Sequence, residues 1–255
     1  MAQVLVTGAS KGIGRATVRE LAARGHRVVA TARNPETLHD LPADIRLSLD
    51  VTDQASVDRA VDAAGAIDTL ISNAGETARG PVETIPLAEV DHLFRLNTLG
   101  ALRVTQAVLP GLRARGGGRV LFLSSVLGRL TIPLSGAYAA SKWALEAIAE
   151  TLAVEAGHFG VKVVVLEPGA VSSGALDRPR TYLADDDPYR PLAAQLAGAR
   201  GSFITVEEVA AATADAVECD DPPFRIPVGS TAETVLAARS AAPPDLPFRI
   251  APFNW

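Results

Sequence analysis

Apolar runs recur along this chain at intervals that suit strands alternating with helices. Two of them, Val120-Leu121-Phe122-Leu123 and Val163-Val164-Val165-Leu166, have no polar residue at alternate positions, which is typical of strands buried on both faces. Segments of helical periodicity separate the runs. The pattern predicts strands near Val4–Val6, Arg27–Thr31, Arg46–Leu49, Thr69–Ser72, Val120–Ser124, Val161–Leu166 and Arg225–Val228.

This alternation predicts an α/β fold, namely a single-domain, doubly wound parallel sheet of the Rossmann type with helices on both faces. A chain of 255 residues with 48% hydrophobic content can bury one sizeable core, so one domain over residues 1–255 is expected. Residues 172–203 and the Pro-rich residues 241–255 do not follow the alternation.

The first predicted strand runs directly into a glycine-rich turn. Val4-Leu5-Val6 is followed by Thr7-Gly8-Ala9-Ser10-Lys11-Gly12-Ile13-Gly14 and then by a helical pattern. Glycines permit a tight turn and a close backbone approach, and the following helix presents free N–H groups to a phosphate. The turn is therefore a candidate dinucleotide site.

A second motif places a phenol and an ammonium on one helical face. Tyr138 and Lys142 are related as i and i+4, about one turn apart. A nearby positive charge stabilises a phenolate, so we expect Lys142 to lower the pKa of Tyr138 from about 10 toward neutrality. Ser125 ends the apolar run before this helix, where its hydroxyl can face the phenol at a sheet edge.

Taken in order, these motifs resemble the short-chain dehydrogenase/reductase family, ordinary single-domain type, over nearly the whole chain. The pattern Thr7-Gly8-x-x-x-Gly12-x-Gly14 resembles the family's cofactor turn, and Asn73-Ala74-Gly75 resembles its sheet-stabilising motif. The resemblance and the residue chemistry together predict cofactor contacts from Gly8, Ser10, Lys11, Gly12, Ile13, Gly14, Arg33, Asp50, Val51, Asn73, Ala74, Gly75, Tyr138, Lys142, Pro168, Gly169, Val171 and Ser173. Two residues depart from the common pattern: Ser72 stands where many members have an asparagine, and Ser173 stands where many have a threonine. At both positions the serine hydroxyl can still donate and accept hydrogen bonds.

The resemblance also implies catalytic roles for Asn97, Ser125, Tyr138 and Lys142. Ser125 would hydrogen-bond the substrate oxygen and Tyr138 would donate the proton, while the nicotinamide delivers hydride. Lys142 would hold the nicotinamide ribose, and Asn97 would hold a water in a proton relay. Ser124 is the alternative for the serine role, although the family's serine-to-tyrosine spacing selects Ser125. The family keeps a substrate lid after its Pro-Gly loop, which here corresponds to residues 172–203.

Charge at the end of the second predicted strand bears on the cofactor. NAD-preferring turns place an acid there, but this chain reads Val28-Val29-Ala30-Thr31-Ala32-Arg33. The Arg33 guanidinium matches a 2′-phosphate, and Lys11 can add a second positive charge. These residues predict NADP(H) as the cofactor.

Reduction of a ketone or aldehyde is the leading function, with alcohol or hydroxysteroid-type oxidation as the alternative direction. A non-catalytic dinucleotide sensor is disfavoured because such proteins usually lose the tyrosine or lysine. An epimerase, dehydratase or lyase usually has a longer C-terminal substrate domain than this chain provides. Apolar candidates for the pocket walls suggest a hydrophobic, ring-bearing small-molecule substrate: Phe94, Leu127, Leu130, Leu134, Leu176 and Tyr182.

Composition limits the other possible partners. A net charge of −5 without a long basic block argues against nucleic-acid and anionic-membrane surfaces, and no apolar run reaches membrane-spanning length. The first predicted strand begins close to Met1, so no signal peptide and a cytoplasmic location are expected. By family analogy, we expect a homodimer or homotetramer.

Remaining polar and sulfur-containing residues are assigned structural roles. His26, His39, His92 and His158 lack metal-ligand spacing and the Asp185–Asp187 run suits a solvated loop, so no metal is predicted. Cys219 is expected to pack as a small apolar residue and Glu167 to satisfy local backbone. Trp143 suits either the core or a subunit contact.

Overall fold

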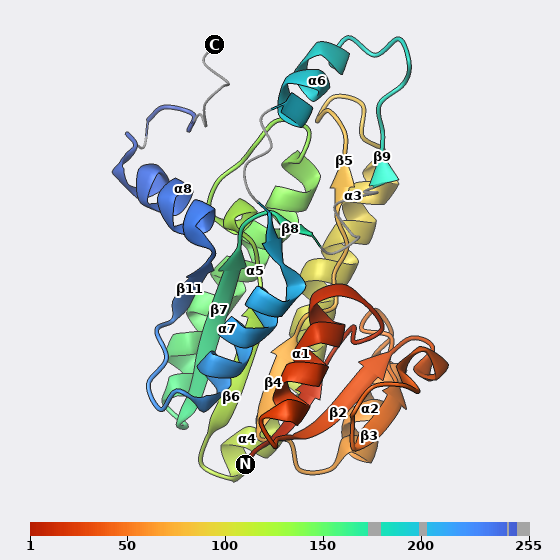
Figure 1. The fold of residues 1–255 in the computed structure, drawn as a ribbon, viewed down its shortest axis with the longest axis vertical. Helices are drawn as coiled ribbons and strands as arrows, with labels where there is room; N and C mark the ends of the chain where they lie inside the picture. Colours follow the sequence, from red (N-terminus) through yellow and green to blue (C-terminus); the bar gives the residue numbers. More distant parts are fainter. Residues whose placement is uncertain (173–179, 199–202, 244, 249–255) are drawn as a thin grey trace.

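A parallel sheet forms the centre of the molecule (Figure 1). The computed structural model describes residues 1–172, 180–198, 203–243 and 245–248. The strand order is β11-β7-β6-β4-β1-β2-β3, and every pair is parallel. The strands are β1 (Gln3–Val6), β2 (Arg27–Ala32), β3 (Ile45–Ser48), β4 (Thr69–Ser72), β6 (Gly118–Leu123), β7 (Val161–Pro168) and β11 (Arg225–Val228). Each overlaps a predicted strand, so the predicted doubly wound parallel sheet is confirmed.

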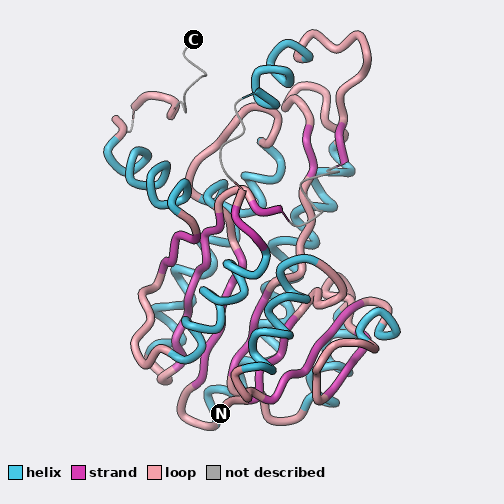
Figure 2. Tube along the Cα trace, in the orientation of Figure 1, coloured by secondary structure: helices cyan, strands magenta, loops and turns pink. Residues whose placement is uncertain are grey.

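Helices connect the strands and cover both faces of the sheet (Figure 2). The α-helices are α1 (Gly12–Ala23), α2 (Gln54–Ala64), α3 (Leu87–Leu93), α4 (Ala101–Ala114), α5 (Gly136–Gly157), α6 (Arg190–Gly198), α7 (Val206–Glu218) and α8 (Ser230–Ala241). Short 3-10 turns occur at η1 (Pro35–Leu38) and η3 (Val126–Gly128), and a π-helical turn, η2 (Phe94–Gly100), lies between α3 and α4.

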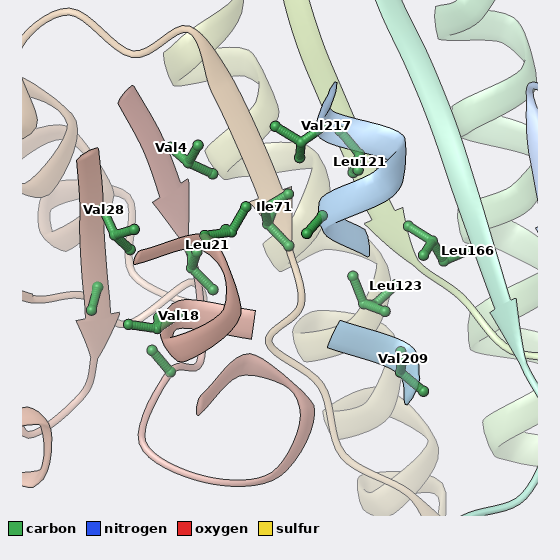
Figure 3. Close-up of a cluster of buried hydrophobic side chains, with 14 of the residues drawn as sticks. Val4, Val18, Leu21, Val28, Ile71, Leu121, Leu123, Leu166, Val209 and Val217 are labelled. Carbon is green, nitrogen blue, oxygen red and sulfur yellow. The ribbon is translucent and has the colours of Figure 1, made fainter. Parts of the chain in front are cut away.

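The alternation of side chains along each strand divides the core into two layers. Val4 and Val6 of β1 belong to the layer on the side of α1 and α7, together with Val18, Leu21 and Val209. Figure 3 shows several side chains of this layer, among them Val4, Val18, Leu21 and Val209. Leu5, between Val4 and Val6, faces the opposite layer formed with α2, α4 and α5. Because neither face is left to water, these strands need no polar alternation, which explains the continuous apolar runs of the sequence.

β1 and β4 are neighbours in the sheet, and the chain extends the sheet in opposite directions from them. β2 and β3 follow on the side of β1, whereas β6, β7 and β11 follow on the side of β4. Connections from the two strands leave toward opposite sides, so a crevice opens beyond their carboxyl ends. The glycine turn follows β1 at this point, and Asn73 follows β4. The fold therefore brings together two motifs that are far apart in the sequence.

Two short parallel ladders lie beyond the carboxyl ends of the sheet (Figure 1). β5 (Ala78–Arg79) pairs with β9 (Arg180–Thr181), and β8 (Val171–Ser172) pairs with β10 (Ile204–Thr205). Their short strands give no periodic signal, and the sequence analysis did not predict them. Of the expected lid, residues 180–198 are described, and residues 173–179 and 199–202 lie outside the described part of the chain.

The prediction for Cys219 is wrong. This cysteine is exposed, because α7 ends at Glu218 and Cys219 follows the helix in an extended conformation outside the packed face. Arg119 donates from Nη2 to the Cys219 carbonyl oxygen at 2.7 Å, which fixes this turn through backbone rather than side-chain packing.

Helix length and polarity bear on membrane insertion. Within the described residues, no helix combines the length and the apolar character that crossing a bilayer requires.

Candidate active site

The glycine turn allows three backbone segments to approach closely. Gly8 has φ +68°, and a Cβ there would lie 2.9 Å from the Ala74 Cα. A Cβ on Gly14 would lie 2.4 Å from Asn73 Nδ2 and 2.6 Å from the Gly8 carbonyl oxygen. Neither position can accept a larger residue without displacing the turn.

Thr7 and Asn73 tie this turn to the end of β4. The Thr7 hydroxyl oxygen accepts hydrogen bonds from the backbone N–H groups of Asn73 at 2.9 Å and Ala74 at 3.0 Å. Asn73 Nδ2 donates to the carbonyl oxygens of Thr7 at 2.8 Å and Gly8 at 3.2 Å. The turn therefore has a fixed conformation within the protein itself, which is what a preorganised cradle requires.

Charged side chains lie past the carboxyl ends of β2 and β3. Arg33 has a 73% exposed side chain and reaches Glu76 at 3.6 Å, and Lys11 is exposed at the start of α1. Burial opposes ionisation of Asp50, but hydrogen bonds from the Thr52 hydroxyl at 2.7 Å and backbone N–H at 2.9 Å outweigh it and lower the Asp50 pKa. This region thus presents the exposed cationic groups of Arg33 and Lys11 beside the carboxylates of Asp50 and Glu76.

Ser125 and Tyr138 meet across the cavity. Ser125 follows β6 in an extended conformation and its hydroxyl accepts from the Leu127 N–H at 3.2 Å, capping η3. Tyr138 lies in the first turn of α5, and the Ser125 hydroxyl acts on its phenol, whose pKa it lowers against the effect of burial. This arrangement agrees with the sequence-based expectation that the serine hydroxyl faces the phenol.

Lys142 lies one turn further along α5 and is 5% exposed. Its Nζ donates to the Leu123 carbonyl oxygen at 2.6 Å and lies 6.0 Å from the centroid of the Tyr138 ring. Burial disfavours the charged form and lowers the Lys142 pKa to about 8, against the raising effect of Glu146.

The expected effect of Lys142 on Tyr138 is not found in this structure. Burial of the phenol raises the pKa of Tyr138 to about 12, against the lowering effect of the Ser125 hydrogen bond. The physical reason is that the ammonium is directed to the Leu123 carbonyl, so desolvation dominates. At neutral pH the phenol is consequently protonated.

Asn97 lies in the π-helical turn η2, a local distortion that is frequent at functional sites. Its amide group bridges the Glu76 backbone, accepting from the N–H at 2.9 Å and donating to the carbonyl oxygen at 2.9 Å. Nδ2 also donates to the Ser141 hydroxyl at 3.0 Å. The side chain therefore fixes the segment after the Asn73-Ala74-Gly75 motif.

These motifs line one cavity of about 500 Å³. The predicted cofactor residues that contribute to its wall are Gly8, Ser10, Lys11, Gly12, Ile13, Arg33, Asp50, Val51, Asn73, Ala74, Gly75, Tyr138, Lys142, Pro168, Gly169 and Val171. Ser124 and Ser125 also line it. Gly14 and Asn97 support the wall from behind, and Ser173 lies outside the described residues.

The sequence analysis identified the apolar wall only in part. Leu127 and Leu130 line the cavity, but Phe94, Leu134 and Tyr182 do not, and Leu176 lies outside the described residues. Tyr182 instead packs against α3 and β5, and its hydroxyl donates to Glu89 at 2.7 Å. The apolar wall residues that sequence reasoning missed include Leu96, Val126, Ile132, Leu196, Phe203 and Val235.

Glu167 is buried, whereas Trp143 is exposed. The prediction for Glu167 is wrong: its 1% exposed carboxylate pairs with Arg129 at 3.4 Å and approaches Arg225 at 3.8 Å rather than bonding local backbone. Trp143 is 42% exposed, which excludes the core and leaves a subunit contact as the surviving expectation.

Glu76 is a polar residue of the cavity wall that the sequence reasoning missed. It directly follows the Asn73-Ala74-Gly75 motif, and its carboxylate also contacts Arg180 at 2.7 Å and His92 at 3.2 Å. Its position after the motif was the available signal. As for metals, no group of three or more potential ligands comes together within residues 1–172, 180–198, 203–243 and 245–248.

Known proteins share this architecture. Residues 2–181 match a family model described as short chain dehydrogenase. The chain is 32% identical over 252 residues to the 3-ketodihydrosphingosine reductase of Bacteroides thetaiotaomicron, with 95% of this chain and 93% of that protein covered. A short-chain dehydrogenase structure from Streptomyces avermitilis matches with a TM-score of 0.85 and 35% identity, covering 94% of this chain and 92% of that one. Another, from Burkholderia cenocepacia in complex with NADP, matches with a TM-score of 0.80 and 26% identity, covering 94% and 93%.

Proposed function

Because this chain belongs to the short-chain dehydrogenase family, whose members are oxidoreductases of CH–OH and C=O groups, we propose that it reduces a lipophilic ketone or aldehyde with NADPH. The observation that carries the proposal is the convergence of Ser125, Tyr138 and Lys142 on the wall of one cavity. A protonated phenol is the form that a carbonyl reduction consumes.

The residues present fit a dinucleotide phosphate. Gly8 and Gly14 let the turn pack closely against Ala74 and Asn73, and this turn leads into the start of α1, where backbone N–H groups are free to bind a phosphate. Arg33 supplies an exposed guanidinium where an acid would select NAD, and the relative from Burkholderia cenocepacia carries NADP. Arg33 and Lys11 would hold the 2′-phosphate, and Asp50 with Val51 would border the adenine.

Each catalytic side chain has a distinct task in the proposed reduction. When bound, the dihydronicotinamide supplies a hydride to the carbonyl carbon. Ser125 donates a hydrogen bond to the carbonyl oxygen, and Tyr138 transfers its proton to that oxygen as negative charge develops there. The Lys142 ammonium would stabilise the resulting phenolate and would hold the nicotinamide ribose once the cofactor is bound. Asn97 keeps the wall segment at Glu76 in position, and a water bound beside it would return a proton toward Tyr138 through Lys142.

The apolar wall supports a bulky, lipophilic substrate. Leu127, Leu130 and Ile132 come from the segment after Ser125, while Leu196, Phe203 and Val235 come from the lid and α8. Such a surface favours an extended alkyl chain or a fused ring system over a small polar ketone. The relative from Bacteroides thetaiotaomicron, a reductase of a long-chain keto compound, supports the same class. Oxidation of the corresponding secondary alcohol is the reverse direction of the same chemistry.

The direct test compares the wild-type protein with Tyr138→Phe. NADPH oxidation is followed at the nicotinamide absorbance with 3-ketodihydrosphingosine, a steroid ketone and a short polar ketone. We expect turnover with the lipophilic ketones, and a fall of kcat by about 10²–10⁴ in the variant because a general acid is removed.

NADPH binding is measured in parallel as the control, since Tyr138→Phe removes one hydroxyl and leaves the phosphate cradle intact. A variant that retains more than roughly a tenth of wild-type kcat with saturating cofactor contradicts the role of Tyr138. A wild-type preference for the short polar ketone contradicts the substrate class.

A further inference from the structure

Helix α5 carries a third polar residue in line with the tyrosine and the lysine. Tyr138, Lys142 and Glu146 are spaced four residues apart, so they lie on one face of the helix. Lys142 is 5% exposed and Glu146 is 4% exposed. Burying a carboxylate costs folding free energy unless hydrogen bonds or an opposite charge compensate for its lost hydration.

The partner of Glu146 neutralises it only in part. Glu146 Oε2 accepts from Arg225 Nε at 3.1 Å, and Oε1 is buried with no hydrogen-bond partner. Arg225 also donates to the exposed Glu150 at 2.7 Å and lies 3.8 Å from Glu167. One guanidinium is therefore shared among three carboxylates, so the Arg225 charge compensates the Glu146 charge only in part. The Glu146 carboxylate consequently acts on neighbouring groups such as Lys142.

Few other charged groups lie near this part of α5. Glu167 on β7 is paired with Arg129, which follows η3, and Arg225 comes from β11. Arg79 of β5 lines the same cavity, and Tyr138 is neutral at ordinary pH. Of these groups, Glu146 is the one that acts on the pKa of Lys142: it raises this pKa while burial lowers it to about 8.

We propose that Glu146 is a positioning residue for the reaction and acts through Lys142, because its buried carboxylate keeps the lysine charged in a desolvated site. The inference rests on the proposed reductase function, in which the ammonium stabilises the Tyr138 phenolate and holds the ribose. Without the carboxylate, burial would act on Lys142 with less opposition, so the neutral amine, which performs neither task, would form at a lower pH.

The sign of the effect follows from simple electrostatics. A carboxylate favours the protonated form of a neighbouring amine, so its removal lowers the pKa of that amine. Lys142 titrates near pH 8, so the loss falls in an accessible range. Glu146→Gln keeps the size and one hydrogen bond to Arg225 but removes the charge.

The experiment titrates Lys142 by the 13Cε signal of lysine-labelled protein. Lys11, Lys142 and Lys162 are the three lysines of the sequence, so Lys11→Arg and Lys162→Arg assign the spectrum. We expect Glu146→Gln to lower the Lys142 midpoint by about half a pH unit or more. Glu150→Gln is the matched control, because it removes an acid bonded to the same arginine on the same helix but exposed to solvent. It should leave the midpoint in place.

The activity measurement is the pH profile of kcat/KM. The alkaline limb should move to lower pH in Glu146→Gln and stay fixed in Glu150→Gln, whereas a purely structural role would lower activity equally at all pH values. Failure of the proposed function is seen separately, as absent ketone reduction in the wild type, while the lysine titration still decides the role of Glu146.

An unchanged Lys142 midpoint in Glu146→Gln overturns the inference, and so does an equal shift in Glu150→Gln. Glu146→Gln removes one carboxylate partner of Arg225 and can prevent folding. In that case Arg225→Gln is compared with the double variant Glu146→Gln/Arg225→Gln, in which both charges of this pair are removed together. The double variant should then have the lower Lys142 midpoint, and equal midpoints overturn the inference.

Discussion

Two neighbouring serines at the end of β6 have different environments, although the sequence makes them look alike. The Ser125 hydroxyl caps η3 through the Leu127 N–H and acts on the Tyr138 phenol, whose pKa it lowers. The Ser124 hydroxyl is buried with no partner, beside Gly128, where a Cβ would lie 2.6 Å from it. Geometry therefore favours Ser125 for contact with a substrate oxygen.

This difference predicts the outcome of two alanine substitutions. Ser125→Ala should lower kcat roughly a hundredfold with NADPH affinity unchanged, because it removes a hydrogen bond to the reacting oxygen. It should also cost about 1 kcal/mol of stability through the lost cap. Ser124→Ala should change kcat less than about threefold, since its hydroxyl makes no hydrogen bond to lose. Steady-state kinetics and thermal melts of both variants measure this, and the opposite order of kcat values would move the role to Ser124.

At the scale of elements, the sequence predicted the central strands well and the ladders above them poorly. Val163 to Leu166 are buried on both sides of β7, so their unbroken apolar run was a sufficient signal. The ladder of β5 with β9 spans two residues on each strand, and ion pairs to residues outside the ladder stabilise it. Arg180 pairs with Glu76 at 2.7 Å and with Glu89 at 3.0 Å, contacts that no local pattern reveals.

The hydrogen bond from Tyr182 to Glu89 predicts how firmly β9 is held. Tyr182→Phe removes a bond of 2.7 Å to a buried carboxylate, so β9 should separate from β5 more often. Hydrogen exchange at the residue 182 amide, which donates to the Arg79 carbonyl oxygen at 2.7 Å, should accelerate several-fold. Tyr189→Phe, which removes a similar bond to Glu83 further along the segment, is the control and should leave that amide unchanged. Equal exchange rates in the wild type and Tyr182→Phe would mean that the ladder is held by other contacts.

At the scale of the whole molecule, the cavity wall combines residues that the sequence predicts well with residues that it does not reveal. The side proposed to hold the cofactor is built from short motifs whose residue types are dictated by chemistry, such as Gly8, Asn73 and Lys142, and most of the residues that the sequence predicts there line the cavity. Its apolar side includes Phe203 and Val235, whose residue types are equally suited to any core. Only the folded arrangement of the lid and α8 over the sheet distinguishes such wall residues from core residues.

The cavity also draws on both halves of the sheet, so a bound cofactor should stabilise the entire fold. Arg33 and Asp50 belong to the half with β2 and β3, while Lys142 and Gly169 belong to the half with β6 and β7. At 100 times its Kd, NADP+ should add about 2.7 kcal/mol of stability. For a chain of this size that corresponds to a rise in Tm of about 5–10 °C.

The cofactor preference can be read from the same melts, without any substrate. NADP+ at a given concentration should raise Tm more than NAD+, and added salt should narrow the difference because the phosphate contacts are screened. The double variant Ala32→Asp/Arg33→Gln should reverse the order, since the new acid repels the 2′-phosphate and accepts hydrogen bonds from the ribose hydroxyls. Arg27→Gln, at the opposite end of β2, removes a comparable exposed charge and should leave the order unchanged. Equal shifts by the two cofactors in the wild type, or an unaltered order in the double variant, would show that Arg33 does not select the cofactor.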